Sequence, residues 1–174
     1  MSRAWAEIGG VTAEDRYLVV NPFFHSFGYK IGIVVGLLTG ATLYPVATFD
    51  VDAVMELIER ERITLLPGAP TIFTSLFDAP GRASRDLSSL RLSITGAAVV
   101  PVVLIERMRA AAPEGLGIDH VYTAFGMTEA VRQLTDDAGA RAVNGAKLGL
   151  VSGFGMVTYD RCLCTGAVIL GAAP

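Results

Sequence analysis

A short stretch of the sequence ends in two side chains that can bind phosphate and metal. Residues 122–130 read Tyr-Thr-Ala-Phe-Gly-Met-Thr-Glu-Ala, so that Thr128 stands beside the carboxylate of Glu129. The hydroxyl of Thr128 can bond a phosphate oxygen, and Glu129 can hold a magnesium ion that neutralises phosphate charge. The small residues before them would let a planar ring lie against the backbone. Taken alone, the same turn also fits an ordinary surface loop.

Short apolar runs and helical patterns alternate along the chain before this stretch. The runs predict buried strands at 17–20, 41–46, 63–66, 90–94 and 118–121. Helices are predicted at 31–38, after an Asp50 cap, from Pro70, and from Pro101 through Met108. This alternation with short connections indicates an α/β fold, a partial, mostly parallel sheet with helices on both faces.

Four turns rich in Pro, Gly and small residues follow the predicted strands, at 22–28, 67–71, 95–98 and 123–129. In open parallel sheets, ligands bind at the carboxyl ends of the strands, which lie at one edge. Four such turns at one edge favour a binding site over four unrelated loops.

The amino-acid sequences of these four turns form a specific set of motifs when they are taken together. They read Asn-Pro-Phe-Phe-His-Ser-Phe-Gly at 21–28, Leu-Pro-Gly-Ala-Pro-Thr at 66–71, Ser-Ile-Thr-Gly-Ala-Ala at 93–98 and Phe-Gly-Met-Thr-Glu at 125–129. In this order the set resembles the adenylate-forming acyl-CoA synthetases, the superfamily shared with luciferases and peptide-synthetase adenylation domains. The wording is most similar to the fatty-acid–CoA ligases, and the branch acting on steroid-ring-derived propanoates is one candidate. The resemblance covers residues 1–130, which would form a partial AMP-binding large domain.

The resemblance implies an activity, its cofactors and a set of site residues. Family members use ATP to convert a carboxylic acid into an acyl-adenylate and then transfer the acyl group to CoA. Fatty and steroid-derived acids are the implied substrates, and ATP/AMP, Mg²⁺ and CoA the implied cofactors. By resemblance, the loop of Thr95, Gly96, Ala97 and Ala98 lies along the adenine, and the ring of Phe125 stacks on the base in a turn that includes Gly126. Thr128 would contact phosphate, and Glu129 would hold magnesium. His25 would stand beside the acyl pocket, and Gly68 and Thr71 would line that pocket.

Each assignment has a purely structural alternative. His25, which lies between the phenylalanines Phe24 and Phe27 in the sequence, also fits a satisfied core histidine, and Phe125 also fits ordinary core packing. Residues 96–98 also fit a close contact between a helix and a strand.

Several parts that the family uses do not occur in these 174 residues. They are the Ser/Thr/Gly-rich phosphate loop that ends in Pro-Lys-Gly, the later aspartate that binds the ribose, and the small C-terminal domain with its catalytic lysine. We therefore expect the chain alone not to catalyse the ligation, because the charge at the α-phosphate lacks its main stabilising groups. Two alternatives stay open. One is a non-catalytic module that binds a nucleotide or an acyl chain, or that pairs with a complementing polypeptide; the other is a gene remnant without a function.

The family pattern stops after Ala130, and residues 131–174 are expected to form a divergent tail from a gene fusion or frameshift. The tail faintly resembles the C-terminal part of thiolase-like lipid-transfer proteins. The plainer interpretation is two apolar strands, one at 148–151, with a Gly-Phe-Gly turn at 153–155 and two inert thiols, Cys162 and Cys164.

Composition excludes several other classes of function. The net charge of -3 provides no basic field for nucleic acid or anionic lipid. The apolar stretch at 31–43 is too short and too rich in glycine for a transmembrane segment, and the first residues contain no apolar signal segment. Two cysteines one residue apart are expected to be reduced thiols, so a cytoplasmic location is expected.

Overall fold

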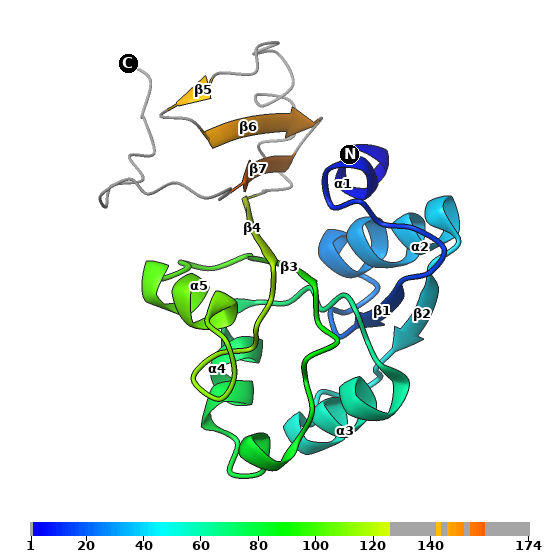
Figure 1. The fold of residues 1–174 in the computed structure, drawn as a ribbon. Coiled ribbons are helices and arrows are strands. Elements are labelled where there is room, and N and C mark those ends of the chain that lie inside the picture. The colour runs from blue at the N-terminus through cyan, green and yellow to red at the C-terminus, as the bar shows by residue number, and fades with distance from the viewer. Residues whose placement is uncertain (1, 126–141, 144–145, 152–153, 159–174) are drawn as a thin grey trace.

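The computed structural model describes residues 2–125, 142–143, 146–151 and 154–158. The strands are β1 (Arg16–Val19), β2 (Thr42–Pro45), β3 (Leu92–Gly96), β4 (His120–Phe125), β5 (Ala142–Val143), β6 (Ala146–Val151) and β7 (Phe154–Thr158). The helices are α1 (Ser2–Ile8), the π-helix η1 (Phe27–Ile33), α2 (Val34–Thr39), α3 (Val51–Glu61), α4 (Pro70–Asp78), the 3-10 helix η2 (Arg82–Ser84) and α5 (Val102–Arg109). Figure 1 shows β1 to β4 among the helices, and β5 to β7 at the upper end beyond β4.

The sheet is parallel from β2 to β4. Strand β1 pairs with β2, and β3 pairs with β4, both in parallel. Residues 63–68 lie between these pairs, because Leu65 bridges to Tyr17 of β1 and Leu92 of β3, and Gly68 bridges to Thr95. Beyond β4 the direction changes, since β7 pairs with β4 and β6 pairs with β7 in antiparallel fashion. The predicted mostly parallel sheet is confirmed.

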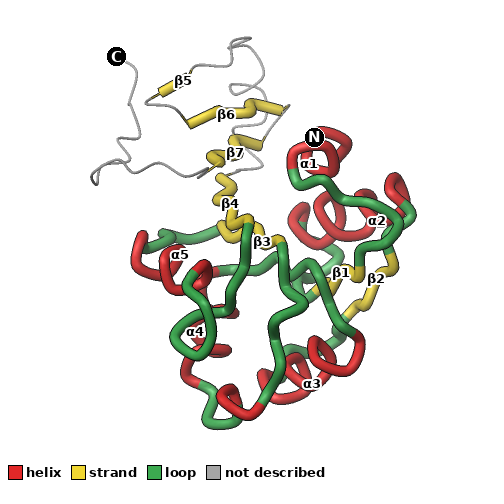
Figure 2. The backbone as a smooth tube through the Cα atoms, in the orientation of Figure 1, coloured by secondary structure: helices red, strands yellow, loops and turns green. Residues whose placement is uncertain are grey.

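Two apolar clusters cover the two faces of this sheet. Successive residues of a strand point to opposite faces, so Leu18 and Leu66 belong to one cluster while Tyr17 and Leu65 belong to the other. The first cluster is completed by α3, α4 and α5, and the second by α1, η1 and α2. Figure 2 shows these helices on the two sides of the strands. The prediction of helices on both faces is therefore confirmed.

Residues at the ends of α3 and at the starts of α4 and α5 determine where these helices begin and end. Asp50 caps α3, because its side chain accepts a hydrogen bond from the backbone N–H of Ala53 at 2.9 Å. At the other end of α3, Arg62 adopts a left-handed conformation with φ of 50°. Pro70 is the first residue of α4, as predicted, whereas Pro101 is the N-cap of α5 and the helix begins one residue later.

The strand boundaries differ from the predicted ones near the motif turns. The predicted strand at 118–121 begins at His120 and runs to Phe125, so residues 123–125 are paired strand and not turn. Likewise, Thr95 and Gly96 belong to β3, and the turn after it begins at Ala97. Backbone pairing with neighbouring strands extends these elements beyond the apolar runs. In the tail, the predicted strand at 148–151 lies in β6, but Phe154 and Gly155, predicted as a turn, belong to β7.

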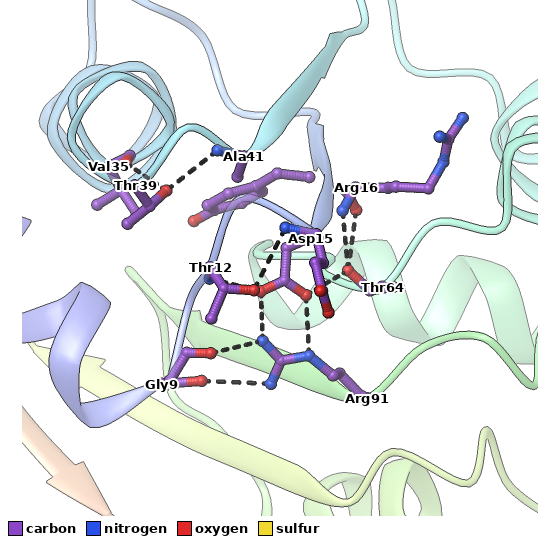
Figure 3. Close-up of polar contacts among 12 residues, drawn as sticks. Gly9, Thr12, Asp15, Arg16, Val35, Thr39, Ala41, Thr64 and Arg91 are labelled. Atoms are coloured by element: carbon purple, nitrogen blue, oxygen red, sulfur yellow. Dashed lines mark hydrogen bonds and ion pairs between the residues drawn. The ribbon is translucent and has the colours of Figure 1, made fainter.

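An ion pair between the buried Asp15 and the half-buried Arg91 joins three segments that lie just before strands of the sheet. Asp15 is 3% exposed and accepts hydrogen bonds from the guanidinium of Arg91, from the hydroxyl of Thr64 at 2.8 Å and from the N–H of Thr12 at 2.9 Å. Arg91 also donates to the carbonyl of Gly9 at 3.3 Å, as Figure 3 shows. Burial by itself would raise the pKa of Asp15, but the hydrogen bonds from Arg91, Thr12 and Thr64 outweigh it and hold that pKa below its usual value.

Candidate functional site

The carboxyl ends of the parallel strands bring the motif turns to one edge of the sheet. Gly68 bridges to Thr95, and Thr95 is the register partner of Thr123, so these three residues form one row across the sheet. The amide of Asn21 donates to the carbonyl of Pro67 at 3.4 Å, which links the first motif turn to the second. The first three turns and the strand that leads into the fourth therefore meet at this edge.

The turn that carries His25 is held by its own backbone. The N–H of His25 donates to the carbonyl of Pro22 at 3.0 Å, and the N–H of Phe27 donates to Nδ1 of His25 at 3.1 Å. A side chain on Gly28 would lie 2.3 Å from the carbonyl oxygen of Pro22, so only glycine allows this chain reversal. Because Nδ1 accepts a hydrogen bond, the neutral imidazole carries its proton on Nε2.

His25 lies at the surface, so the interpretation as a core histidine is wrong. The neighbouring Phe24 is 94% exposed and Phe23 is 47% exposed. Phe23 and Phe24 point outward with His25, whereas Phe27, two residues further on, is 4% exposed and lies in the core. His25 is thus available to a ligand at this edge through Nε2.

Gly68 and Thr71 occupy different positions in the second turn. Gly68 is buried, and its N–H donates to the carbonyl of Ile94 at 2.9 Å. Thr71 is exposed in the first turn of α4, where its carbonyl accepts a hydrogen bond from the hydroxyl of Thr74 at 3.0 Å. Gly68 therefore belongs to the sheet, whereas Thr71 faces the surface.

The third turn begins in the core and ends at the surface. Thr95 is 0% exposed, and its hydroxyl oxygen has no hydrogen-bond partner among the described residues. A side chain on Gly96 would lie 2.1 Å from the carbonyl oxygen of Ala124, so the close approach is between two strands and not between a helix and a strand. Ala97 has a φ of 65°, in the left-handed region, and both Ala97 and Ala98 are exposed. Two small, exposed residues thus follow a buried hydroxyl.

Only the beginning of the fourth motif falls within the described residues. Phe125 ends β4, and its backbone is paired with Gly155 of β7. Gly126, Thr128 and Glu129 lie outside the described residues, so their predicted contacts with base, phosphate and magnesium remain predictions. The same holds for Cys162 and Cys164 in the tail.

A cluster of aromatic residues supports β4 from the side of α1. Trp5 is 2% exposed and meets the ring of Tyr122 edge-on, with 5.7 Å between the ring centroids. The hydroxyl of Tyr122 donates to the carbonyl of Ile8 at 3.2 Å, and that of Tyr17 donates to the carbonyl of Ile31 at 2.7 Å. Burial raises the pKa of the Tyr17 hydroxyl. The motif turns gave no sign of this support, although the single tryptophan of the chain was a signal for it.

The described residues contain neither a cluster of metal-binding side chains nor a membrane-spanning helix. Within them, no group of three or more His, Cys, Asp or Glu side chains is arranged to hold a metal ion. None of the helices in the described ranges is both long and apolar enough to cross a membrane.

Comparison with known proteins gives a consistent result. The family model described as "AMP-binding enzyme" matches residues 1–152. The chain is 56% identical over 131 residues to a 3-[(3aS,4S,7aS)-7a-methyl-1,5-dioxo-octahydro-1H-inden-4-yl]propanoyl:CoA ligase from Rhodococcus jostii, covering 75% of this chain and 25% of that protein. The ligase of the same name from Mycobacterium tuberculosis is 58% identical over 129 residues, covering 74% of this chain and 25% of that protein. The chain thus spans about a quarter of the length of these relatives.

Solved structures agree with the sequence comparison. A fatty acyl CoA synthetase from Mycobacterium tuberculosis superposes with a TM-score of 0.64 at 28% identity, covering 74% of this chain and 24% of that one. An O-succinylbenzoate coenzyme A synthetase from Bacillus subtilis, solved with ATP and magnesium ion, gives a TM-score of 0.61 at 27% identity over 74% of this chain and 25% of that one. The motifs, the sheet that gathers them and the family match over most of the chain lead to one conclusion: this chain belongs to the AMP-binding enzyme family.

Proposed function

We propose that the chain forms part of the nucleotide- and acid-binding region of an ATP-dependent carboxylic acid–CoA ligase. The observation that carries this proposal is the row of Gly68, Thr95 and Thr123, which joins three motif segments at one edge of the sheet. The acyl-CoA ligase names of the two relatives support it.

The described residues at this edge fit an adenine nucleotide. Ala97 and Ala98 are small and exposed, so a planar base can lie against the backbone beside them. In such a ligase ATP supplies the adenylate that activates the acid, and CoA accepts the acyl group. We assign the adenine to residues 95–98 and the base-stacking turn to Phe125 and Gly126. His25, Gly68 and Thr71 are assigned to the acid, Thr128 to phosphate and Glu129 to Mg²⁺.

The names of the two relatives of more than half identity support the substrate class that we propose. Both are named as ligases of a propanoyl group that carries a methylated, dioxo-substituted octahydroindene ring system. We propose a propanoate on a fused-ring, steroid-derived skeleton as the acid, with fatty acids as the broader class. The proposed location is the cytoplasm, where ATP and CoA are available.

Titration calorimetry of AMP into the folded chain tests the nucleotide part of the proposal. We expect saturable heat that disappears in an Ala98→Asp variant, because a carboxylate beside the base would repel the nucleotide phosphate and block the flat surface. Ala98 is the suitable position because it is exposed, whereas a change at Gly96 would disturb the sheet. A cooperatively folded chain that gives no heat with AMP or ATP would contradict the proposal and favour the gene remnant.

A second candidate function is a non-catalytic module that works with a complementing polypeptide. It is favoured by strongly exposed apolar side chains, since Phe24, Val99 and Leu37 are 94%, 90% and 78% exposed. Mixing the chain with the segments of the Rhodococcus jostii relative that flank the matched region tests this candidate. Co-elution of the parts on size-exclusion chromatography would support it, and separate elution would oppose it.

A further inference from the structure

The helix that follows the turn of His25 changes its hydrogen-bond spacing along its length. At the end of η1, the N–H of Val34 donates to the carbonyl of Tyr29, five residues back. In α2, which continues the same helix, the N–H of Gly40 donates to the carbonyl of Gly36, four residues back. A helix that changes from a spacing of five to a spacing of four has one carbonyl more than it has N–H groups at the change. Such π-helical segments are frequent at functional sites.

A tyrosine of the core supplies an extra donor at this change of spacing. The hydroxyl of Tyr17, on β1, donates to the carbonyl of Ile31 in η1 at 2.7 Å. The indole N–H of Trp5, in α1, donates to the oxygen of the same hydroxyl at 3.3 Å. An indole N–H can only donate, so the hydroxyl proton is directed to Ile31. Tyr17 is 0% exposed, and burial raises its pKa, so the hydroxyl keeps this proton.

The first turn of η1 holds the turn of His25 in place. The N–H of Phe27 donates to Nδ1 of His25 at 3.1 Å, and the N–H of Tyr29 donates to its carbonyl at 3.0 Å. Further along, η1 lies directly against β1, because a Cβ atom on Gly32 would lie 2.8 Å from Cγ1 of Val19. The rotation of η1 about its axis therefore decides where these two N–H groups point, and so where His25 lies.

We propose that Tyr17 is a positioning residue for the acid-binding site, because its bond to the carbonyl of Ile31 keeps η1 in the π form that holds Nε2 of His25 exposed at the edge of the sheet. This inference rests on the proposed function, in which His25 is assigned to the acid. Without the hydroxyl, the helix would remove its surplus carbonyl by taking the α spacing throughout. That change would rotate the first turn of η1 by about 100°, the angle of one residue in an α-helix, and move the N–H of Phe27 away from His25.

NMR of the two histidines tests the inference on three chains: the unchanged chain, Tyr17→Phe and Tyr44→Phe. Tyr44→Phe is the matched control, because it removes a tyrosine hydroxyl from the neighbouring strand β2, one that donates to the carboxylate of Glu61 at 3.3 Å and packs beside the cluster on the other face of the sheet. In the unchanged chain and in Tyr44→Phe, the neutral imidazole of His25 should carry its proton on Nε2. In Tyr17→Phe it should become a mixture of the two tautomers, while that of His120 stays as it is.

Thermal unfolding and calorimetry separate positioning from a purely structural role. Tyr17→Phe should lower the Tm by about 4–8 °C, because it leaves two buried polar groups without their partner. It should bind the free acid of the propanoyl group named for the two relatives about tenfold more weakly, and change the affinity for AMP by less than about twofold. Tyr44→Phe should leave both affinities unchanged. A purely structural hydroxyl would lower the Tm but leave the His25 tautomer and the ratio of the two affinities as they are.

The other outcomes overturn the inference in distinct ways. If Tyr17→Phe folds and His25 keeps its proton on Nε2, the hydroxyl does not position it. If the tautomer changes and the acid still binds as tightly, Tyr17 holds η1 but has no part in binding the acid. If the unchanged, folded chain binds neither the acid nor AMP, the proposed function fails, while the tautomer still shows whether Tyr17 holds η1.

The unchanged chain decides the matter if Tyr17→Phe does not fold. The inference is then supported by a hydroxyl proton of Tyr17 that is protected from exchange and gives a cross-peak to the indole N–H of Trp5, together with the Nε2–H form of His25. The lack of either signal overturns it.

Discussion

Gly96 shows how closely β3 and β4 approach each other at the candidate site. A Cβ atom at this position would lie 2.1 Å from the carbonyl oxygen of Ala124, which is backbone and cannot move aside alone. The residue type is therefore dictated by the pairing of the strands, and the turn that follows is positioned by it.

Gly96→Ala should accordingly destabilise the fold by about 2–4 kcal/mol, in the range of changes that distort a packed core. Urea unfolding followed by circular dichroism measures this free energy. Gly81→Ala is the matched control, because the nearest atom to its Cβ would be a carboxylate oxygen of Asp52 at 3.7 Å, an ordinary contact. Equal stability of the two variants would show that β3 and β4 are farther apart than the structure has them.

At the scale of elements, the ion pair of Asp15 and Arg91 joins the loop before β1, the segment at 63–68 and the start of β3. The two side chains come from positions 76 residues apart, and Asp15 also binds the hydroxyl of Thr64. Asp15 is buried, while the side chain of Arg91 is 32% exposed, so the guanidinium left without its partner stays partly solvated. Asp15→Asn should therefore reduce the free energy of unfolding at pH 7 by about 1–3 kcal/mol, the range for hydrogen bonds to a charged group.

The same carboxylate gives a pH dependence with a definite sign. Its pKa lies below the ordinary value of 3.8 in the folded chain, so the unfolded state binds a proton more readily. The stabilisation is complete above the ordinary value and is lost as the pH falls through the folded pKa. Unfolding curves recorded from pH 7 downward should lose stability in acid, and Asp15→Asn should flatten that slope. Asp86→Asn, which breaks an exposed pair with Arg62, should have a much smaller effect at pH 7.

The pairing of β4 with β7 leads to a second prediction, which concerns how β7 holds the backbone of β4. The N–H of His120 donates to the carbonyl of Arg91, so the even-numbered residues of β4 direct their backbone groups toward β3. The odd-numbered residues then face β7, where Thr123 is opposite Val157. Strand β7 therefore holds the segment that leads directly into the fourth motif.

Hydrogen exchange followed by mass spectrometry or NMR tests this arrangement. The amide of Thr123 should exchange slowly, and Val157→Pro should accelerate its exchange by removing a backbone donor that faces β4. Met156→Pro is the control, because its N–H faces β6 and its effect on Thr123 should be smaller. Rapid exchange at Thr123 in the unchanged chain would mean that β7 does not pair there.

At the scale of the whole molecule, the described fold brings the motif turns to one edge of the sheet, where we propose that the nucleotide binds. The sequence contains no Pro-Lys-Gly loop, and its net charge is -3. Stabilisation of charge at the α-phosphate contributes several kcal/mol in enzymes of this kind of chemistry. A polypeptide of these 174 residues should therefore release no pyrophosphate from ATP and a carboxylic acid above the level of its Glu129→Ala variant. Release above that level, in a coupled pyrophosphate assay, would refute this expectation.

Some parts of this structure are encoded locally and could be predicted. Asp50 and the helical spacing after it predict α3, and Pro70 marks the start of α4, because caps and fixed φ angles act within one turn of helix. The alternation of strands and helices predicts the parallel sheet, and the motif turns predict which edge of it carries the site. All of these signals depend on neighbours in the sequence.

Other parts depend on contacts between distant segments, and only the tertiary structure decided them. The packing of the elements decides that His25 is exposed, that β4 runs to Phe125 and that Asp15 meets Arg91. The sequence by itself determined the family motifs, the class of fold and the order in which the turns occur. The tertiary structure decided that Gly68, Thr95 and Thr123 lie in one row and that the hydroxyl of Thr95 is left unsatisfied there, because strand register and burial arise only when separate strands pair.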